Sequence, residues 1–488
     1  MPGPRPLPAL TRLCNAALLG ALATAAPALR ADPVPVTVLH GFTGSAGDAA
    51  MPGSAPTLGT DGNFYGVTPQ GGLNQMGAIY QTLPDGSTHT LFSFPQDGSA
   101  GVRPVQHLVR DAHNNFYGMA NGGPAGAHGV VFKVTPSGQY TVLHAFAADG
   151  TEGTVLDNGL VMGADGALYG VASCGGATYP WACGGTFFRI RTDGTQFSVR
   201  YNFPPGADGQ AATPQARLAK GADGNFYGIA ASYYSGSTPG YGALYRITPA
   251  GVATTLTGFT DGHLEAPTGT PQIDSAGLIH FFGSARDSSM WGRVYRFDLS
   301  TGVLSTLHQF NGADGVVGGS DQLLLGQDGR LYGVAIHGGS HSAGFGSEPY
   351  GTVFSLGLDG SFNLLHDFGA PQDAADPQGA VFTAKDGSLW GTSTTSTIQS
   401  TPGTIYRMTP PTETLTVRPK SITVGQKATL TWSSTASTDC AATGAWVAGA
   451  LNTSGSTTVV PGAVGTYYYT MTCTGAGSVV RTVSLTVH

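Results

Sequence analysis

Charged residues are scarce in this 488-residue chain: Asp, Glu, Lys and Arg make up 10% of it, with 29 acids against 22 bases. An acidic balance of this kind argues against nucleic acid and anionic membranes as partners. Long apolar runs are also missing, since no stretch after residue 31 approaches the roughly 20 consecutive apolar residues of a membrane-spanning helix. These shortages argue against a nucleic-acid-binding protein and against a membrane span.

The first 31 residues have the features of a secretory signal. Arg5 and Arg12 precede or flank the start of an apolar Ala/Leu-rich run, and small residues near its end fit cleavage after Ala28 or Ala31. Removing this segment takes away three of the 22 bases and none of the 29 acids, which leaves a net charge of 19 − 29 = −10. We therefore expect a protein that is secreted or held in the periplasm or at the surface of a bacterial cell.

Cysteine is rare, with five residues in the whole chain, and Cys14 would leave with the signal. The other four allow three pairings, and proximity in the sequence favours Cys174 with Cys183 and Cys440 with Cys473. Disulfides form and persist in the oxidising compartments to which a secretory signal directs a chain.

Glycine, in contrast, is abundant, with 75 residues, and much of it recurs in a motif of the form Asp-Gly-x-(Phe/Leu)-Tyr-Gly with a period of about fifty residues. The motif cores end at Gly66, Gly118, Gly170, Gly228, Gly283, Gly333 and Gly391. Two further markers, a Gly-x-aliphatic-aromatic segment and a segment closing on Phe, keep the same period and also occur seven times. The chain is therefore a tandem array of seven repeats.

Each repeat is predicted to form four short strands, which in the first repeat are residues 36–42, 57–60, 63–68 and 77–82. Tight turns join the second strand to the third and the fourth to the next repeat, whereas the other connections are long and variable. In an up-and-down sheet these long loops all lie on one face, which is the expected functional face. The N-terminal strand can complete the last sheet, so the pattern predicts a closed seven-bladed β-propeller over residues 32–409.

The repeats resemble the GloVer tandem-repeat family of exported bacterial "choice-of-anchor" proteins. The matching segments include LHGF ending at Phe42, DGNFYG from Asp61, GGLNQMGAIY from Gly71 and GTIYRM from Gly403, and the resemblance covers residues 36–408. It implies a β-propeller without an assigned function and with a variable C-terminal surface anchor. The chain departs from the pattern in its fifth repeat, where residues 275–283 read SAGLIHFFG, and it shows no recognisable sorting signal at its end.

After a predicted linker at residues 410–413 the composition shifts to Thr, Ser and Val with strand-like alternation. Residues 414–488 are therefore predicted to form a second, smaller β-sandwich. It resembles bacterial immunoglobulin-like modules, although Cys440 follows the strand of Trp432 instead of lying within it. The predicted fold is all-β: a seven-bladed propeller followed by an immunoglobulin-like sandwich.

Several residue patterns could indicate metal or catalytic chemistry, but each has a structural explanation. His40, His144, His308 and His366 share a strand position that elsewhere holds Phe, Tyr or Thr, which is typical of packing. One Asp per long loop could bind Ca²⁺, but Asp capping its own turn explains the pattern as well. The sequence His337-Gly-Gly-Ser-His341 lacks an obvious third metal ligand. We therefore expect no metal or cofactor, and no catalytic residue is assigned.

The long loops are rich in aromatic residues, which suit sugar faces or protein partners unless they fold inward over neighbouring sheets. The candidate ligand-binding residues of these loops are Tyr179, Trp181, Tyr233, Tyr234, Tyr241, Trp291 and Tyr350, and Phe345 belongs to the same group. A second set should line the central channel: Thr57, His107, Gly159, Arg217, Gln272, Gln322 and Ala380. This lining holds no carboxylate pair for two-acid glycoside hydrolysis.

Three functional hypotheses follow from these residues. The first is an exported, non-enzymatic protein that binds an extracellular glycan or protein with the loops of one propeller face. The second is a polysaccharide lyase or hydrolase that works in the channel with His107 and Arg217. The third is a purely structural component of the cell envelope.

Overall fold

The computed structural model describes residues 34–45, 47–177, 183–205, 210–235, 238–259, 266–284, 291–317, 322–340, 350–369, 373–396, 401–410, 412–435, 437–475 and 477–488. Across these residues the chain is all-β, and its one helical element is a short 3-10 turn, η1 (Pro124–Gly126). No helix in this part of the chain is long and apolar enough to cross a membrane.

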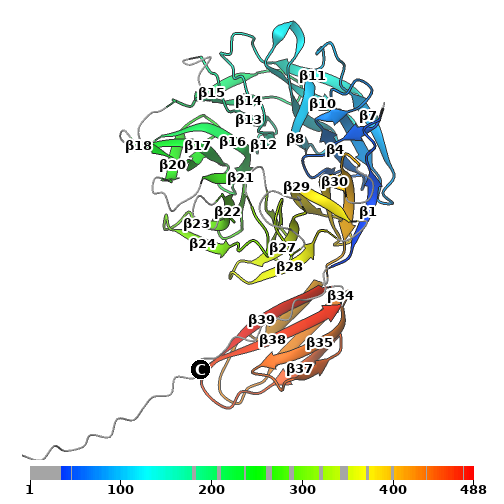
Figure 1. Cartoon of the computed structure of the whole chain (residues 1–488). Coiled ribbons are helices and arrows are strands. Elements are labelled where there is room, and N and C mark those ends of the chain that lie inside the picture. The colour runs from blue at the N-terminus through cyan, green and yellow to red at the C-terminus, as the bar shows by residue number, and fades with distance from the viewer. Residues whose placement is uncertain are drawn as a thin grey trace, which may run out of the picture. The chain divides into compact units, whose positions relative to one another are not determined.

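Seven antiparallel sheets follow one another along the described chain up to Met408, each built from four neighbouring strands (Figure 1). Sheet 1 contains β3 (Thr57–Leu58), β4 (Phe64–Thr68), β6 (Ala78–Thr82) and β7 (Thr88–Ser93). Sheet 2 contains β8 (Val102–Arg110), β9 (Phe116–Asn121), β10 (Gly129–Val134) and β11 (Tyr140–Ala145). Sheet 3 contains β12 (Leu160–Met162), β13 (Leu168–Ala172), β14 (Thr186–Ile190) and β15 (Ser198–Asn202).

The remaining four sheets repeat this order. Sheet 4 contains β16 (Ala211–Lys220), β17 (Phe226–Ser235), β19 (Ala243–Ile247) and β20 (Ala253–Gly258), with β18 (Thr238–Gly240) paired to β17. Sheet 5 contains β21 (Pro267–Ile273), β22 (Leu278–Gly283), β23 (Arg293–Asp298) and β24 (Leu304–Gln309). Sheet 6 contains β25 (Leu324–Leu325), β26 (Arg330–Ala335), β27 (Thr352–Gly357) and β28 (Phe362–Asp367). Sheet 7 contains β29 (Ala374–Thr383), β30 (Leu389–Ser396), β31 (Thr404–Met408) and β1 (Val36–Gly41).

Sheet 7 joins the two ends of the repeat array. Its outer strand β1 pairs antiparallel with β31, from Val36 opposite Met408 to Gly41 opposite Thr404. A buried cluster that includes Phe42, Phe64, Tyr80 and Trp390 then packs sheet 7 against sheet 1. The N-terminal strand therefore takes the place that the first strand of the next repeat takes in the other sheets. A small ribbon of β2 (Ala49–Ala50) and β5 (Gln70–Gly71) lies in the loops beside it.

The repeated motif places a glycine against an aromatic side chain in every sheet. A Cβ atom at the motif glycine would overlap the aromatic ring of the next strand, as Gly66 shows with Tyr80. The other pairs are Gly118 with Phe132, Gly170 with Phe188, Gly228 with Tyr245, Gly283 with Tyr295, Gly333 with Phe354 and Gly391 with Tyr406. The fifth sheet differs in register, because Phe281 and not Gly283 lies opposite Tyr295. The period-fifty spacing of Gly and aromatic residues is therefore the spacing of one packing contact that the other six sheets share.

The Asp of the motif ties the tight turn to the strand that follows. In the first repeat Asp61 accepts the Asn63 backbone N–H at 3.0 Å and the Tyr65 hydroxyl at 2.6 Å. In the divergent fifth repeat, Asp274 accepts the Leu278 N–H at 2.9 Å and faces Nε2 of His280 at 3.2 Å. The His–Asp pair therefore substitutes for the Tyr–Asp pair that this repeat lacks.

The C-terminal residues form two further sheets. One contains β32 (Thr412–Arg418), β34 (Ala428–Thr435) and β37 (Ser454–Val459), and the other contains β33 (Ser421–Ile422), β39 (Gly477–Val487), β38 (Gly465–Gly475), β35 (Ser437–Gly444) and β36 (Gly449–Leu451). Strand β32 begins at Thr412, so the predicted linker 410–413 is too long by its last two residues. A buried cluster that includes Leu430, Tyr469 and Leu485 packs the two sheets together.

Both predicted disulfides, Cys174 with Cys183 and Cys440 with Cys473, are confirmed. Cys440 and Cys473 lie directly opposite each other on the paired strands β35 and β38. The bond therefore links two strands of one sheet and does not cross between sheets.

Candidate functional site

The first strands of five sheets enclose a cavity of about 450 Å³ at the centre of the repeat array. Figure 1 shows β8, β12, β16 and β21 around this centre. The cavity is lined by Thr57, Leu58, Leu108, Val109, Arg110, Val161, Met162, Arg217, Leu218, Ala219, Lys220, Thr270, Pro271, Gln272 and Ile273. We call this cavity and the buried residues just beside it the channel site.

The charge of the channel site is opposite to that of the whole chain. Its lining includes Arg110, Arg217 and Lys220 and no Asp or Glu, whereas the chain as a whole has 29 acids and 22 bases. Clefts lined by one sign of charge concentrate ligands of the opposite sign.

His107 is a buried member of the channel site, with 7% of its surface exposed. Its Nδ1 lies 2.6 Å from the Ala55 carbonyl oxygen, and because a carbonyl only accepts, Nδ1 carries the proton. Burial and, to a smaller extent, the nearby positive charge of Arg217 lower the pKa of His107 to about 4. The ring is therefore neutral near pH 7, with the lone pair on Nε2.

Polar atoms around His107 have few partners. The side chain of Gln322 interacts with His107 and partly offsets the lowering of its pKa. This interaction is not a well-formed hydrogen bond, since Nε2 of His107 has no partner of suitable distance and angle in the described chain. The same is true of Nε of Arg217 and of the hydroxyl of Thr270, which is 3% exposed. Burial lowers the pKa of Arg217, and the described residues provide no counterion for it. The site thus holds a cation and buried polar atoms with unused hydrogen-bonding capacity.

Three of the seven predicted channel positions, Thr57, Arg217 and Gln272, line the cavity, but Thr57 and Gln272 are not equivalent in register to His107. Strand pairing places Thr57 opposite Tyr65 and Gln272 opposite His280, which is the register of Val109 opposite Tyr117 in sheet 2. Thr57 and Gln272 thus lie two residues further along their strands than His107, and the equivalents of His107 are Ala55 and Thr270. Gly159, Arg217, Gln322 and Ala380 keep their predicted equivalence, each standing directly before the aliphatic residue that faces the next strand.

The loop aromatics that the structure describes do not project into solvent. Tyr241, Trp291 and Tyr350 are each half-buried and pack against core clusters between neighbouring sheets, so they are not fully exposed rings, and their role in ligand binding stays a prediction. An aromatic ring is more stable against the apolar edge of a core than in water, which explains this inward packing. Tyr179, Trp181 and Phe345 lie outside the described residues, and only the backbones of Tyr233 and Tyr234, on β17, are described.

Three of the four recurrent histidines pair with carboxylates of the long loops, whereas Nε2 of His40 has no hydrogen-bond partner in the described chain. Nε2 of His144 lies 2.9 Å from Glu152, that of His308 lies 3.1 Å from Asp314, and that of His366 lies 2.9 Å from Asp373. Each ring also packs edge-on against the Phe two residues later. Sequence reasoning missed this pairing because the offset between His and carboxylate varies.

No group of three or more potential metal ligands occurs among the described residues. His337 contributes its carbonyl oxygen to the Val316 N–H at 2.7 Å, and His341 lies outside those residues.

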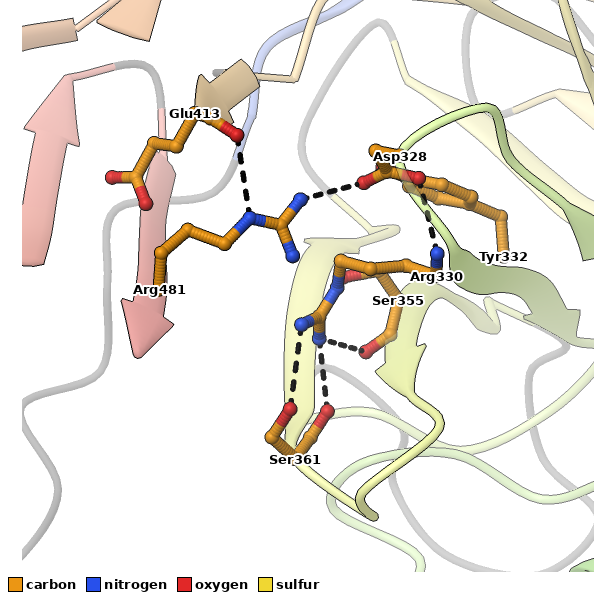
Figure 2. A network of polar contacts seen from close by, with 7 residues as sticks. All are labelled: Asp328, Arg330, Tyr332, Ser355, Ser361, Glu413 and Arg481. Atoms are coloured by element: carbon orange, nitrogen blue, oxygen red, sulfur yellow. Dashed lines mark hydrogen bonds and ion pairs between the residues drawn. The ribbon is translucent and has the colours of Figure 1, made fainter. Parts of the chain in front are cut away.

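A separate polar network surrounds Asp328 on sheet 6 (Figure 2). Asp328 accepts the Tyr332 hydroxyl at 2.9 Å and pairs with Arg481 of β39 at 2.9 Å. Arg481 also donates to the Glu413 carbonyl oxygen at 3.3 Å. Arg330 donates to the side chain of Ser355 and to the carbonyl of Ser361.

Glu413 is the unusual member of this network, because its carboxyl group is buried. One oxygen accepts the Cys473 N–H at 2.8 Å, and the other has no hydrogen-bond partner in the described chain. Burial raises the pKa of Glu413 to about 8, and the Cys473 N–H and the charges of Arg481 and Arg330 offset only part of this effect. Near pH 7 the carboxyl group is therefore mostly protonated.

Glu413 should make the C-terminal strands less stable as the pH rises. Its pKa in the folded chain is about 8, against 4.5 for the ordinary group, so the folded state retains the proton that the unfolded state loses between these values. Stability is full below about pH 4.5 and falls through this window. A shift of this size allows a loss of up to 1.36 kcal/mol for each pH unit of the window. We expect a smaller total loss of about 2 kcal/mol, because solvent partly reaches the buried charge.

Calorimetric melting across this pH range tests the prediction, with Glu413→Gln as the control. Gln keeps the acceptor for Cys473 but does not titrate, so the variant should lack the decline. A decline of the same size in the variant would assign it to other groups.

The repeats identify the family of this chain. A family model described as the Gloeobacter/Verrucomicrobia repeat matches residues 28–234, 148–345 and 213–459. The chain belongs to this repeat family, as the sequence motifs predicted. No curated protein matches it.

Solved structures resemble the chain only distantly. An ulvan lyase of polysaccharide lyase family 25 is 11% identical with a TM-score of 0.47, over 75% of this chain and 94% of the other. A copper-containing fungal alcohol oxidase is 13% identical with a TM-score of 0.47, over 93% and 99%. The extracellular domain of a hybrid two-component system from B. thetaiotaomicron is 10% identical with a TM-score of 0.46, over 90% of this chain and 55% of that longer domain. Likeness at this level does not bear on function.

Proposed function

We propose that the chain is an exported, non-enzymatic binding protein that takes its ligand in the channel site. In this proposal residues 32–409 form a closed seven-bladed propeller, and an immunoglobulin-like sandwich begins at Thr412. The seven successive sheets and the pairing of β1 with β31 support the propeller. The two C-terminal sheets packed over one core support the sandwich.

The observation that carries the proposal is the channel site itself. Inner strands of five sheets converge on one cavity of about 450 Å³, which is within the size range of small-molecule sites. Nε2 of His107 and the hydroxyl of Thr270 have no well-formed hydrogen bond in the described chain. Buried polar groups are usually satisfied, so a ligand that satisfies them explains why they are kept.

Export fits the proposal. The disulfides favour an oxidising compartment, and the first 31 residues have the features of a secretory signal. Extracellular glycans are the expected ligand class, because they are abundant where such a protein would work and present many hydrogen-bonding groups.

Enzyme activity in the channel is the second candidate function, and one observation favours it. The neutral His107 ring has an unshared pair on Nε2 beside a cation, which is the arrangement of a general base next to an electrostatic stabiliser. However, a base with a pKa of about 4 abstracts protons weakly near neutral pH. We therefore give binding without turnover as the preferred function.

Filling the channel tests both candidates. Ala219 lines the cavity, so Ala219→Trp should abolish binding in a screen of soluble polysaccharides while the melting temperature stays within a few degrees. Thr57→Tyr is a second filling variant from another strand, should the first misfold. Binding that survives both substitutions would place the site elsewhere, and product formed by the unsubstituted chain would favour the enzyme.

A further inference from the structure

Arg217 is a cation that the described chain leaves without a counterion. Taking a guanidinium out of water costs free energy unless an anion pairs with it, and Arg110 and Lys220 add two more positive charges to the same lining. Because the guanidinium is planar with five donors, it fits the oxygens of a carboxylate or sulfate in a bidentate arrangement.

The backbone just before Arg217 has a conformation that residues with a Cβ atom rarely adopt. The preceding residue, Ala216, has φ = 57°, and the pairing of β16 with β17 shifts between Gln215 and Ala219. The equivalent positions in sheets 5 and 7 are glycines, Gly269 and Gly379, with φ of 73° and 70°. A bulge of this kind re-aims a side chain toward a site, and here a residue with a Cβ atom keeps it despite the strain.

His107 can bind a different group of the same ligand. Its Nδ1–H donates to the Ala55 carbonyl, so Nε2 of the neutral ring can only accept a hydrogen bond. A carboxylate or sulfate oxygen cannot donate to it, but a hydroxyl group can. The hydroxyl of Thr270, also without a partner in the described chain, can either donate or accept.

We infer that the channel site binds an anionic sugar, with its carboxylate or sulfate on Arg217 and a sugar hydroxyl donating to Nε2 of His107. This inference rests on the proposed function, since it names the ligand class of the same cavity. A neutral glycan would leave the cation unpaired, and a simple anion would leave Nε2 of His107 unpaired.

Calorimetric titration of the purified full chain with four defined probes tests the inference. The probes are an oligogalacturonate, its fully methyl-esterified form, a sulfated oligosaccharide of similar length, and propionate. We expect the oligogalacturonate or the sulfated oligosaccharide to bind, and whichever binds more tightly identifies the anionic group. The neutral ester should bind at least about 30-fold more weakly, the effect of losing a buried charged contact of about 2 kcal/mol. Propionate keeps the charge but has no hydroxyl group for Nε2 of His107, and it should also bind at least about 30-fold more weakly.

Substitutions should separate the charge of Arg217 from the charge of the whole chain. Arg217→Gln should weaken binding of the charged probe about 30-fold, and Arg217→Lys should recover part of it. The control is Arg191→Gln, which removes the same charge from a side chain that is 53% exposed. Melting curves show whether each variant folds, and Arg217→Lys keeps the test open if Arg217→Gln does not.

The outcomes distinguish this inference from the proposed function. Failure of both anionic probes to bind, or binding that Arg217→Gln leaves unchanged, overturns the anionic-sugar inference. If a neutral glycan binds, and Ala219→Trp abolishes this binding while Arg217→Gln does not, the channel is a binding site but its ligand is not anionic. Binding that survives Ala219→Trp and Thr57→Tyr overturns the proposed function itself.

Discussion

Deleting residues 34–42 is expected to abolish cooperative unfolding of the repeat region. The deletion removes all of β1, which pairs with β31 over five residue pairs, and with it Val34 and Phe42, both fully buried. Strand β31 would then be an exposed edge with unpaired backbone groups, a common start of aggregation. Burial of two large side chains alone contributes about 3 to 6 kcal/mol, a large share of the total stability of a domain.

Thermal unfolding and light scattering would show this effect as a broad, low-temperature transition with soluble or insoluble aggregates. A synthetic peptide of residues 34–42 is the control, because an added strand can complete a sheet edge through the same backbone hydrogen bonds. The peptide should restore the sharp transition. An unchanged melting curve in the deleted chain would show that the pairing of β1 with β31 does not hold the two ends of the repeat array together.

The repeats were predictable from the sequence because they depend on local contacts. Each tight turn uses an Asp such as Asp61 to bind the next strand, and each sheet uses a glycine such as Gly66 to admit an aromatic ring. Both contacts connect residues at fixed short spacings, so they appear as a motif. The disulfide pairs were predictable for a similar reason, since each joins the nearest available cysteine.

The channel site was only partly predictable, because bulges change the register of the inner strands. The pairing shifts between Val105 and Val109 in β8 and between Thr268 and Gln272 in β21. Counting along the sequence therefore misjudged the register of Thr57 and Gln272 by two residues, although both line the cavity. The absence of a counterion for Arg217 could not be predicted either, since it depends on five strands that are far apart in the chain.

The partial burial of the loop aromatics could not be predicted from the sequence, for a physical reason. Exposure was inferred from their place in irregular segments, but Trp291 lies against the cluster between sheets 5 and 6. Where a loop crosses the edge of a core, its large aromatic rings lie next to apolar surface and pack against it. Irregular backbone is thus no sign that a side chain is free.

The repeated contact between glycine and aromatic ring gives the second large prediction: Gly228→Ala should destabilise the repeat region by about 3 kcal/mol. A Cβ atom there would overlap the Tyr245 ring and come within 2.7 Å of a Leu218 methyl group. Both neighbours are fully buried and cannot move aside, so the substitution overpacks the core. Denaturant unfolding should show a lower midpoint with an unchanged slope.

A double-mutant cycle with Tyr245→Ala isolates the contact. Once the ring is removed, Gly228→Ala should change the free energy of unfolding by less than about 1 kcal/mol, because the Leu218 side chain can then shift into the space that the ring leaves and make room for the added methyl group. Gly53→Ala is the matched control, since no atom lies within 4 Å of a Cβ there. If Gly228→Ala costs the same with and without the Tyr245 ring, backbone conformation and not ring packing explains the glycine, and the same revision would extend to the pairs of the same register in the other sheets.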